Sequence, residues 1–231
     1  MSEPQNPNTI IIKNQYYQKG LKEIDIWKYY KSNQGLILRE TMGRDVMFAI
    51  ATNTNEFILK RKDSGKTFIR LNQSNFDNLI HGRTTVIYSI MNRVEEFGIV
   101  DIDTDNWNDA RETAQLIFRS LRDMNVIESL QIRYTGKLSF HIKCNFRSRY
   151  DISIIKQMLY DHLSQDQNIT RNCTIEKKRN GREPNIDLFP NVFRAAHITL
   201  GSLSTMGLRC IEVPYDKVMY YTRDSARIFA S

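Results

Sequence analysis

The sequence predicts an α+β fold, and three observations lead to this prediction. Several short runs are rich in β-branched and aromatic residues and are separated by turn residues, which is typical of strands. Three other stretches carry apolar residues at helical spacing. Many of the strand-like runs follow one another without an intervening helix, so we expect strands paired through hairpins and not a strictly parallel sheet.

The first part of the chain is expected to hold one short helix followed by strands. The helix covers residues 24–31. The strand-like runs are residues 35–41, 46–53, 56–62 and 67–72. Asp63, Ser64 and Gly65 form a plausible hairpin turn between the last two runs. Residues 85–91 are a short apolar run that fits either a further strand or the start of a helix.

The second part of the chain is expected to alternate helices with paired strands. From Trp107 to about Met124 apolar residues recur at helical spacing, and Asp105 or Asn106 can cap the start of that helix. An amphipathic helix is expected at 151–163. The strand-like runs are residues 130–136, 138–146, 185–189 and 208–214.

Composition and charge limit the class of protein. With 231 residues, 41% of them hydrophobic, the chain can bury a sizeable core, as one compact domain or two closely joined lobes. The net charge of +7 suggests a polyanionic partner. No apolar run is long enough to cross a membrane, and the polar start lacks the features of a signal peptide, so we expect a soluble intracellular protein, not secreted and without a membrane partner. The widely spaced Cys144, Cys173 and Cys210 are interpreted as buried thiols.

Residues 98–109, GIVDIDTDNWND, gather aspartates after an apolar run. If this run is a strand, Asp101 and Asp103 project from the same side of it. Two carboxylates that are close together repel each other unless a cation lies between them, and oxygen ligands suit Mg²⁺ or Mn²⁺. The pattern therefore suggests a divalent-metal site. Capping of the following helix explains Asp105 but leaves the other two aspartates unexplained.

A calcium-binding loop is the alternative for residues 101–112. Five acidic residues fall on ligand positions of the EF-hand pattern, namely Asp101, Asp103, Asp105, Asp109 and Glu112. Against this hypothesis, Asn106 stands where the pattern has an invariant glycine, and no second such loop exists in the chain. A glycine and a β-branched pair also precede Asp101, where an EF-hand needs an entering helix.

Further polar residues add to the candidate site. Ser139 and His141 share one face of the strand expected there, so that both can donate hydrogen bonds to phosphate oxygens, with Lys137 as a point charge. A histidine in a strand is often structural, which stays the alternative. Asp187 lies inside an otherwise apolar run, and a buried carboxylate is costly unless it is paired or bound to metal.

The order of these motifs resembles the archaeo-eukaryotic primase superfamily, whose three motifs are matched by VDID, SFH and NID. Residues 193–214 are similar to a segment of the primase small subunit, and the layout of residues 16–53 is similar to the polymerase domain of bacterial DNA ligase D. The resemblance implies a primase-polymerase domain over residues 1–231, with an N-terminal α/β lobe at about 10–95. A palm-like antiparallel sheet, similar to the RNA-recognition fold, would carry the metal site within 96–231.

The resemblance also implies an activity and its site. The chain would be a template-dependent nucleotidyltransferase that acts on nucleoside triphosphates and on single-stranded or primed DNA, with a helper subunit as a further partner. Asp101, Asp103 and Asp187 would hold two Mg²⁺ or Mn²⁺ ions. The expected nucleotide contacts are Lys137, Ser139, His141, Arg194 and Ser202.

The chain departs from the family pattern at several points. Ser204 stands where the primase small subunit has a histidine and ligase D polymerases an arginine, which weakens the expected phosphate contact there. Arg209 or His197 is a candidate to compensate. The cysteine-rich zinc knob of many primase small subunits is missing, and a stand-alone catalytic core is expected.

Two basic stretches fit a nucleic-acid partner. The expected phosphate contacts are Lys60, Arg61, Lys62 and Lys66 at one hairpin tip, and Lys177, Lys178, Arg179 and Arg182 at another. Solvated hairpin tips explain either stretch as well. Trp107, Tyr29 and Tyr30 can stack on bases, but their helical positions favour the core. The rival for the whole chain is a nucleic-acid-binding module of the same fold without catalysis.

Overall fold

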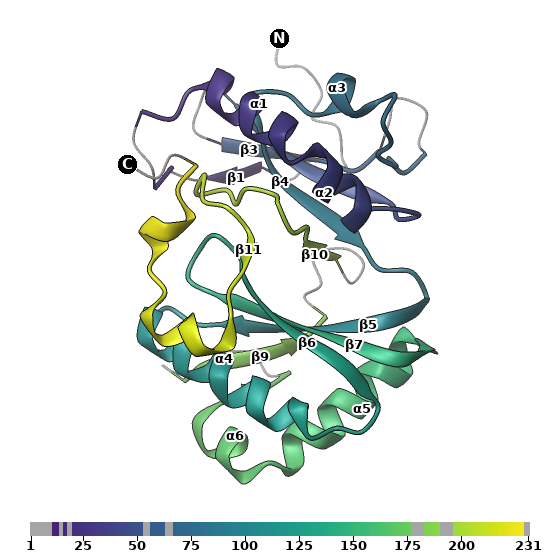
Figure 1. The fold of residues 1–231 in the computed structure, drawn as a ribbon, viewed down its shortest axis with the longest axis vertical. Coiled ribbons are helices and arrows are strands. Elements are labelled where there is room, and N and C mark those ends of the chain that lie inside the picture. The colour runs from purple at the N-terminus through teal and green to yellow at the C-terminus, as the bar shows by residue number, and fades with distance from the viewer. Residues whose placement is uncertain are drawn as a thin grey trace. The chain divides into compact units, whose positions relative to one another are not determined.

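The computed structural model describes residues 11–13 (backbone only), 16–17, 20–52, 56–62, 67–176, 183–189 and 196–228. These residues divide into two compact units, coloured by chain position in Figure 1. The first unit takes the described residues of 1–90, 198–210 and 226–231, and the second those of 91–197 and 211–225. Both later stretches of the first unit lie within the range that the sequence assigned to the second lobe. Helices and mainly antiparallel strands confirm the α+β prediction.

The first sheet has the strand order β1-β3-β2-β4-β10. Its strands are β1 (Ile11–Lys13), β2 (Val46–Ala51), β3 (Glu56–Lys60), β4 (Thr84–Ile90) and β10 (Ala196–Ile198). β3 pairs antiparallel with both β1 and β2, and β2 pairs antiparallel with β4. The run 85–91, which the sequence left open, therefore lies almost wholly in a strand.

Three helices belong to the first unit, namely α1 (Glu23–Ser32), α2 (Gln34–Glu40) and α3 (Phe76–Leu79). Ile26, Tyr30 and Ile37 of the first two helices pack into one core cluster with Phe48 and Ile87 of the sheet. The core interpretation of Tyr30 is confirmed, because its side chain is only 1% exposed.

Two strand predictions in this unit are wrong. Residues 35–41 form most of α2, and the buried side chains of Gln34, Ile37 and Thr41 follow helical spacing. Among the described residues, 67–72 form no named strand, and Phe68 and Ile69 pair through isolated bridges to Lys62 and Val46. Short apolar runs do not distinguish strand from helix, and pairing partners decide whether an extended run joins a sheet.

The second sheet has the strand order β11-β6-β7-β5-β9-β8. Its strands are β5 (Val94–Asp103), β6 (Ile127–Tyr134), β7 (Phe140–Asp151), β8 (Thr174–Ile175), β9 (Asn185–Leu188) and β11 (Ile211–Glu212). All neighbours pair antiparallel except β8 and β9, which are parallel. β5 lies between β7 and β9, so its backbone is hydrogen-bonded on both sides.

Helices α4 (Trp107–Arg122), α5 (Ile152–Gln165) and α6 (Gln167–Asn172) lie together on one side of this sheet (Figure 1). Asn106, one of the two predicted caps, stands at the start of α4, and Asp151 caps α5. The Asn106 side chain accepts hydrogen bonds from the first turn of α4, and the Asp151 side chain accepts one from Ser153 N in α5. Two 3-10 helices, η1 (Tyr215–Tyr220) and η2 (Arg223–Ala226), follow β11.

Aromatic and sulfur-containing side chains fill the interior as expected. Trp107 stacks on Phe140 with the ring centroids 5.3 Å apart, which favours its core interpretation over a role in base stacking. The three cysteines are buried free thiols, as predicted. Burial raises the pKa of the Cys144 thiol, so this group stays neutral.

Candidate functional site

Alternation along β5 determines on which side of the second sheet its two aspartates lie. Gly98 lies against Ile155 of α5, so the even-numbered positions of β5 face the helices. Val100 and Ile102 are fully buried on that side. Asp101 and Asp103 therefore project from the opposite side. The prediction that these two aspartates share one face of a strand is confirmed.

Pairing on both sides of β5 brings two further predicted residues beside Asp101. Asp101 lies opposite Asp187 in the ladder with β9 and opposite His141 in the ladder with β7. Directly opposed residues of an antiparallel pair share a face, and their Cβ atoms lie about 4.5–5.5 Å apart. Strand register thus converts motifs that are distant in sequence into one spatial cluster, with Asp103 two positions further along β5.

The same row of residues continues across β6 and β11. His141 lies opposite Arg133, and Arg133 lies opposite Glu212. The charged row therefore consists of Asp187, Asp101, His141, Arg133 and Glu212. Arg133 is only 1% exposed, and its Nη2 donates to Gln131 Oε1 over 2.7 Å. Sequence reasoning missed Arg133, although a charge inside an apolar strand is the signal that singled out Asp187.

His141 and Asp101 form a direct contact in the middle of the charged row. The distance from His141 Nε2 to Asp101 Oδ1 is 3.2 Å, and the two side chains are 5% and 20% exposed. The Nε2–H group donates to the carboxylate, which fixes the ring with Nε2 toward the aspartates. One oxygen of Asp101 is engaged in this way, and the other is left for a further ligand.

The environment of Asp187 disfavours its negative charge. Burial raises the pKa of Asp187, and the carboxylates of Asp101, Glu176 and Asp103 raise it further. A hydrogen bond of 2.7 Å from Asn185 Nδ2 to Asp187 Oδ1 acts in the opposite direction. The hydrogen bond from Asn185 therefore does not fully offset the cost of a negative charge at Asp187. A bound cation would relieve the repulsion between the carboxylates.

A short, internally bonded loop connects β6 to β7 next to the charged row. Thr135 Oγ1 lies 2.7 Å from Ser139 Oγ and donates to Ser139 O over 3.0 Å, which closes the loop at its base. Gly136 has a φ of 83°, a left-handed conformation that favours glycine. Tyr134 Oη donates to Lys137 O over 2.7 Å and so holds the backbone of Lys137 in place.

The ammonium group of Lys137 lies in the field of the aspartates. The surrounding protein removes water from this group and lowers its pKa, while Asp101 and Asp103 act in the opposite direction. The Lys137 side chain is nevertheless exposed to solvent, so its ammonium group remains hydrated and acts as a cation. A positive charge on a fixed loop beside two aspartates suits the binding of an anion that is complexed with metal cations.

The donor set fits a hard divalent cation by its chemistry. Carboxylate oxygens are the ligands that Mg²⁺ and Mn²⁺ prefer. The pKa of Asp187 is raised first by burial and then by the neighbouring carboxylates, and a cation would remove the repulsion from those carboxylates. Within the described part of the chain, no group of three or more His, Cys, Asp or Glu side chains is placed closely enough to hold a metal ion. Joint binding by Asp101, Asp103 and Asp187 therefore requires side-chain rotation, while the strand backbone can stay in place.

The fold can be compared with solved structures. The polymerase domain of Mycobacterium tuberculosis ligase D, solved in complex with DNA, superposes with a TM-score of 0.70 at 12% sequence identity. The match covers 89% of this chain and 85% of that domain. The two folds are similar. At this identity the likeness shows the fold alone, and no family model and no curated protein sequence matches the chain.

Two serines of the 193–214 segment have structural partners in the first unit. Ser202 is fully buried, and its Oγ accepts from Ile87 N over 2.7 Å and donates to Leu203 O over 2.9 Å. Ser204 Oγ accepts from the backbone NH of Leu208 within a tight turn. Ser202 belongs to the first unit and the charged row to the second, so its expected nucleotide contact stays a prediction.

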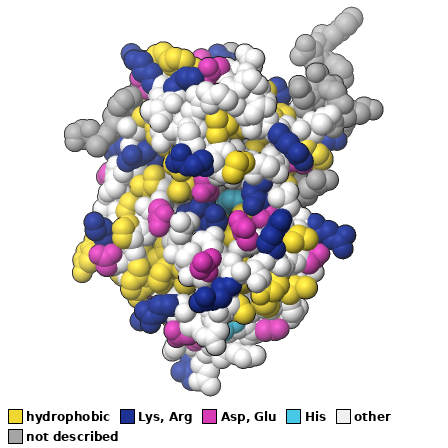
Figure 2. Space-filling model, turned by 45° about the vertical axis from the view of Figure 1, so that its right-hand side comes forward, with side chains coloured by type: hydrophobic (Ala, Val, Ile, Leu, Met, Phe, Trp, Pro, Cys, Tyr) yellow, Lys and Arg dark blue, Asp and Glu magenta, His cyan; other side chains and the backbone are white. Residues whose placement is uncertain are grey.

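The predicted basic contacts are only partly within the described residues. Lys60 is exposed at the end of β3, and Lys62 Nζ lies 5.4 Å from the centroid of the Phe68 ring. Lys66, Lys177, Lys178, Arg179, Arg182 and Arg194 lie outside the described residues. On the face shown in Figure 2, basic and acidic side chains are interspersed, without one large basic patch.

The calcium-loop alternative does not agree with the local structure. An EF-hand needs a helix before its first ligand, whereas the residues before Asp101 belong to the ten-residue strand β5. Asp101 and Asp103 are themselves paired with β9 in the sheet. The first two ligand positions therefore cannot wrap around a calcium ion in a loop.

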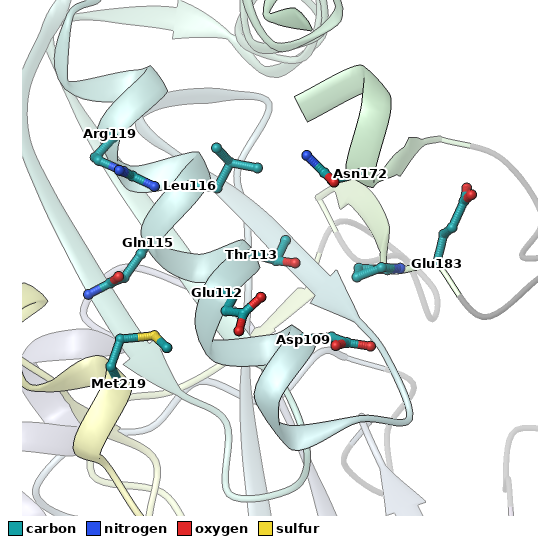
Figure 3. A pocket seen from close by; sticks show the side chains of 10 residues that line it. Asp109, Glu112, Thr113, Gln115, Leu116, Arg119, Asn172, Glu183 and Met219 are labelled. Carbon is teal, nitrogen blue, oxygen red and sulfur yellow. The ribbon is translucent and has the colours of Figure 1, made fainter. Parts of the chain in front are cut away.

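A separate concavity of about 530 Å³ lies along α4 (Figure 3). Its lining includes the carboxylates of Asp109, Glu112 and Glu183, and the basic side chain of Arg119. None of its described lining residues belongs to the charged row. This excess of negative charge is unsuited to a nucleic acid. Among the helices that the structure describes, none has the length and apolar character needed to span a membrane.

Proposed function

We propose that the chain is a nucleotidyltransferase that adds nucleotides to a DNA strand under the direction of a template. The observation that carries this proposal is the strand register, which sets Asp187 directly opposite Asp101 with Asp103 on the same face. The similarity of the fold to a polymerase domain solved with DNA supports it. Retention of all three carboxylates favours an active enzyme over a binding module that has lost its chemistry.

Asp101, Asp103 and Asp187 are the residues that would hold two Mg²⁺ or Mn²⁺ ions. When bound, such a pair of ions activates the attacking hydroxyl and stabilises the leaving pyrophosphate. The protein contributes position, because β5 is hydrogen-bonded to β7 and β9 on its two sides. Carboxylates on a central strand keep their backbone in place while the side chains turn toward the ions.

The residues beside the aspartates would bind the triphosphate. Lys137 supplies a positive charge from a fixed loop, and Ser139 lies at the base of the same loop. His141 holds Asp101 through Nε2 and is the candidate to contact a phosphate oxygen when the aspartates turn toward the ions. Arg194 and Ser202 stay further candidates for nucleotide contacts.

Basic side chains outside the charged row would bind the phosphate backbone of the template and primer. The candidates are Lys60, Arg61, Lys62, Lys66, Lys177, Lys178 and Arg179. Contacts of this kind position a nucleic acid without reading its sequence, and they make the affinity fall steeply with rising salt. A helper subunit that supplies further contacts is compatible with this arrangement.

The test is nucleotide incorporation on single-stranded DNA with and without an annealed primer. Each substrate is combined with Mg²⁺, Mn²⁺ or Ca²⁺ and with ribonucleotides or deoxyribonucleotides. Incorporation that depends on Mg²⁺ or Mn²⁺ and is lost in Asp101→Ala and Asp187→Ala supports the proposal. The control Asp161→Asn removes a carboxylate from the exposed face of α5 and should retain wild-type rates.

The two substrates also separate two kinds of enzyme. Products on the unprimed strand indicate a primase, whereas products on the primed strand alone indicate a polymerase. Wild-type rates in Asp187→Ala would refute the proposed carboxylate set. Salt-sensitive DNA binding without incorporation under any condition would favour the non-catalytic binding module.

A further inference from the structure

Asn185 lies at the junction of three strands beside the charged row. It is only 4% exposed, and it pairs with Asp103 of β5 on one side and with Thr174 of β8 on the other. It also precedes Asp187 by two positions on β9, so both side chains project from the same face. Asn185 is therefore a buried, uncharged amide that lies next to the carboxylates of the site.

Two hydrogen bonds fix the Asn185 side chain in one orientation. Thr174 Oγ1 donates to Asn185 Oδ1 over 2.9 Å, and Asn185 Nδ2 donates to Asp187 Oδ1 over 2.7 Å. A carboxylate only accepts hydrogen bonds, so the NH₂ end of the amide must face Asp187. The carbonyl end then faces Thr174, whose hydroxyl group supplies a proton. The result is a directed chain from Thr174 through Asn185 to Asp187.

We propose that Asn185, held by Thr174, is a positioning residue that prepares Asp187 to bind a divalent cation. The hydrogen bond restrains Oδ1 of Asp187 and limits rotation of the carboxylate, which leaves Oδ2 as the oxygen that can turn toward Asp101 and Asp103. This inference rests on the proposed function, because it assumes that Asp187 is a cation ligand.

The position of Asn185 makes it more than a buried polar residue. Its amide bridges the edge strand β8 to a carboxylate that is proposed to bind a cation, so its removal affects a cation ligand as well as the sheet. Partners that orient a metal ligand commonly change metal affinity by about 10–100-fold when they are removed. An effect of that kind on cation affinity is what a purely structural role would not produce.

The experiment measures Mn²⁺ binding by electron paramagnetic resonance of the free ion, without nucleotide or DNA, so the readout does not depend on catalysis. Asn185→Ala should weaken Mn²⁺ binding by about 10–100-fold relative to wild type. Thr174→Val keeps the shape of Thr174 but removes its donor, and it should weaken binding by about 10-fold, the lower end of that range. Thr174→Ser restores the hydroxyl group and should bind Mn²⁺ as wild type does.

A matched control exists in the same sheet. Asn145 Nδ2 donates to Ser129 Oγ over 2.9 Å across β7 and β6, and neither residue belongs to the charged row. Asn145→Ala should therefore leave Mn²⁺ affinity within about twofold of wild type, whatever it does to stability. Circular dichroism and the melting temperature of each variant identify any loss of folding, and Thr174→Val provides the test if Asn185→Ala does not fold.

The outcomes separate this inference from the proposed function. Loss of Mn²⁺ binding in Asp187→Ala with wild-type affinity in Asn185→Ala and Thr174→Val overturns the positioning role and leaves the cation site standing. Wild-type affinity in Asp187→Ala, or no Mn²⁺ binding by the wild-type protein, overturns both. Weakening in Asn185→Ala and Thr174→Val, with rescue by Thr174→Ser, supports the inference.

Discussion

Replacing Asp187 by asparagine is expected to stabilise the protein when divalent cations are absent. Burial first, and then the neighbouring carboxylates, raise the pKa of Asp187, so the folded state carries the charged form at a free-energy cost. Asparagine keeps an oxygen that can accept the hydrogen bond from Asn185. The substitution Asp187→Asn therefore removes the charge and retains the contact.

The size of the effect follows from strand register. Asp101 lies directly opposite Asp187, so their carboxylates are about 6 Å apart, given the Cβ separation of opposed residues. Two like charges at that distance repel by about 0.7 kcal/mol in bulk water and by about 2.8 kcal/mol at an effective dielectric constant of about 20. Both side chains retain contact with water, so screening favours the lower half of this range. We expect Asp187→Asn to raise the free energy of unfolding by about 1 kcal/mol.

The pH dependence provides a second check with a definite sign. A carboxyl group whose pKa is raised in the folded state destabilises the fold above that folded-state pKa, and it has no such effect below the ordinary value of 3.8. The advantage of Asp187→Asn should thus be complete near neutral pH and should vanish as the pH falls through this window. Wild-type stability should accordingly rise relative to the variant during the same acidification.

Urea unfolding in the presence of EDTA measures both effects. Asp161→Asn is the control, because loss of an exposed helix carboxylate should change stability by less than about 0.5 kcal/mol. Adding Mn²⁺ should stabilise wild type more than Asp187→Asn. If Asp187→Asn is less stable than wild type near neutral pH in EDTA, the carboxylate supports the fold and the argument from repulsion fails.

Three further predictions concern the strand and loops around the site. Gly98→Ala would place a Cβ atom 2.9 Å from Ile155 Cγ2, and urea unfolding should show a loss of about 1–3 kcal/mol from overpacking. Asn106→Ala removes the N-terminal cap of α4 and should lower the free energy of unfolding by about 1 kcal/mol, whereas Asn106→Asp should retain most of it. Tyr134→Phe frees the backbone of Lys137 and should raise the KM for nucleotide more than it lowers kcat, and an unchanged KM in steady-state kinetics would contradict this role for the loop.

The parts of the fold that the sequence predicted correctly are those with local signals. α4 and α5 combine an apolar stripe with a capping side chain, at Asn106 and Asp151, and both helices start where those signals place them. Residues 35–41 were wrongly predicted as a strand, and the Asn33 side chain at the start of α2 makes no capping hydrogen bond. Their apolar run is only three residues long, and one of its members, Ile37, is fully buried in α2. A run of three apolar residues fits both the helical and the strand period. Packing against the core of the first unit decides between helix and strand.

The sequence predicted which residues of the candidate site share one side of a strand. It did not predict which residues of neighbouring strands lie opposite each other. Period-two alternation placed Asp101 and Asp103 on one side of a strand, because this depends only on local geometry. The pairing of Asp187 with Asp101 joins segments that are far apart along the chain, and nothing in either segment specifies the partner. The involvement of Asn185 depends on that pairing as well, so it became visible only with the structure.

The position of the aspartates in the sheet decides how loss-of-function variants can be interpreted. β5 pairs with β7 as far as Asp101 and with β9 from Val100 to Asp103, so the backbone at both aspartates is held by ladders and not by the aspartate side chains. The alternate positions of the same strand, Val100 and Ile102, are fully buried against the helix side and anchor it in the core. Substituting Asp101 therefore removes a negative charge and the contact with His141 Nε2, but no pairing of the backbone and no buried apolar side chain. Loss of activity in a folded Asp101→Ala protein would for this reason indicate lost chemistry, whereas the same result at the buried Ser202 could equally reflect a disturbed fold.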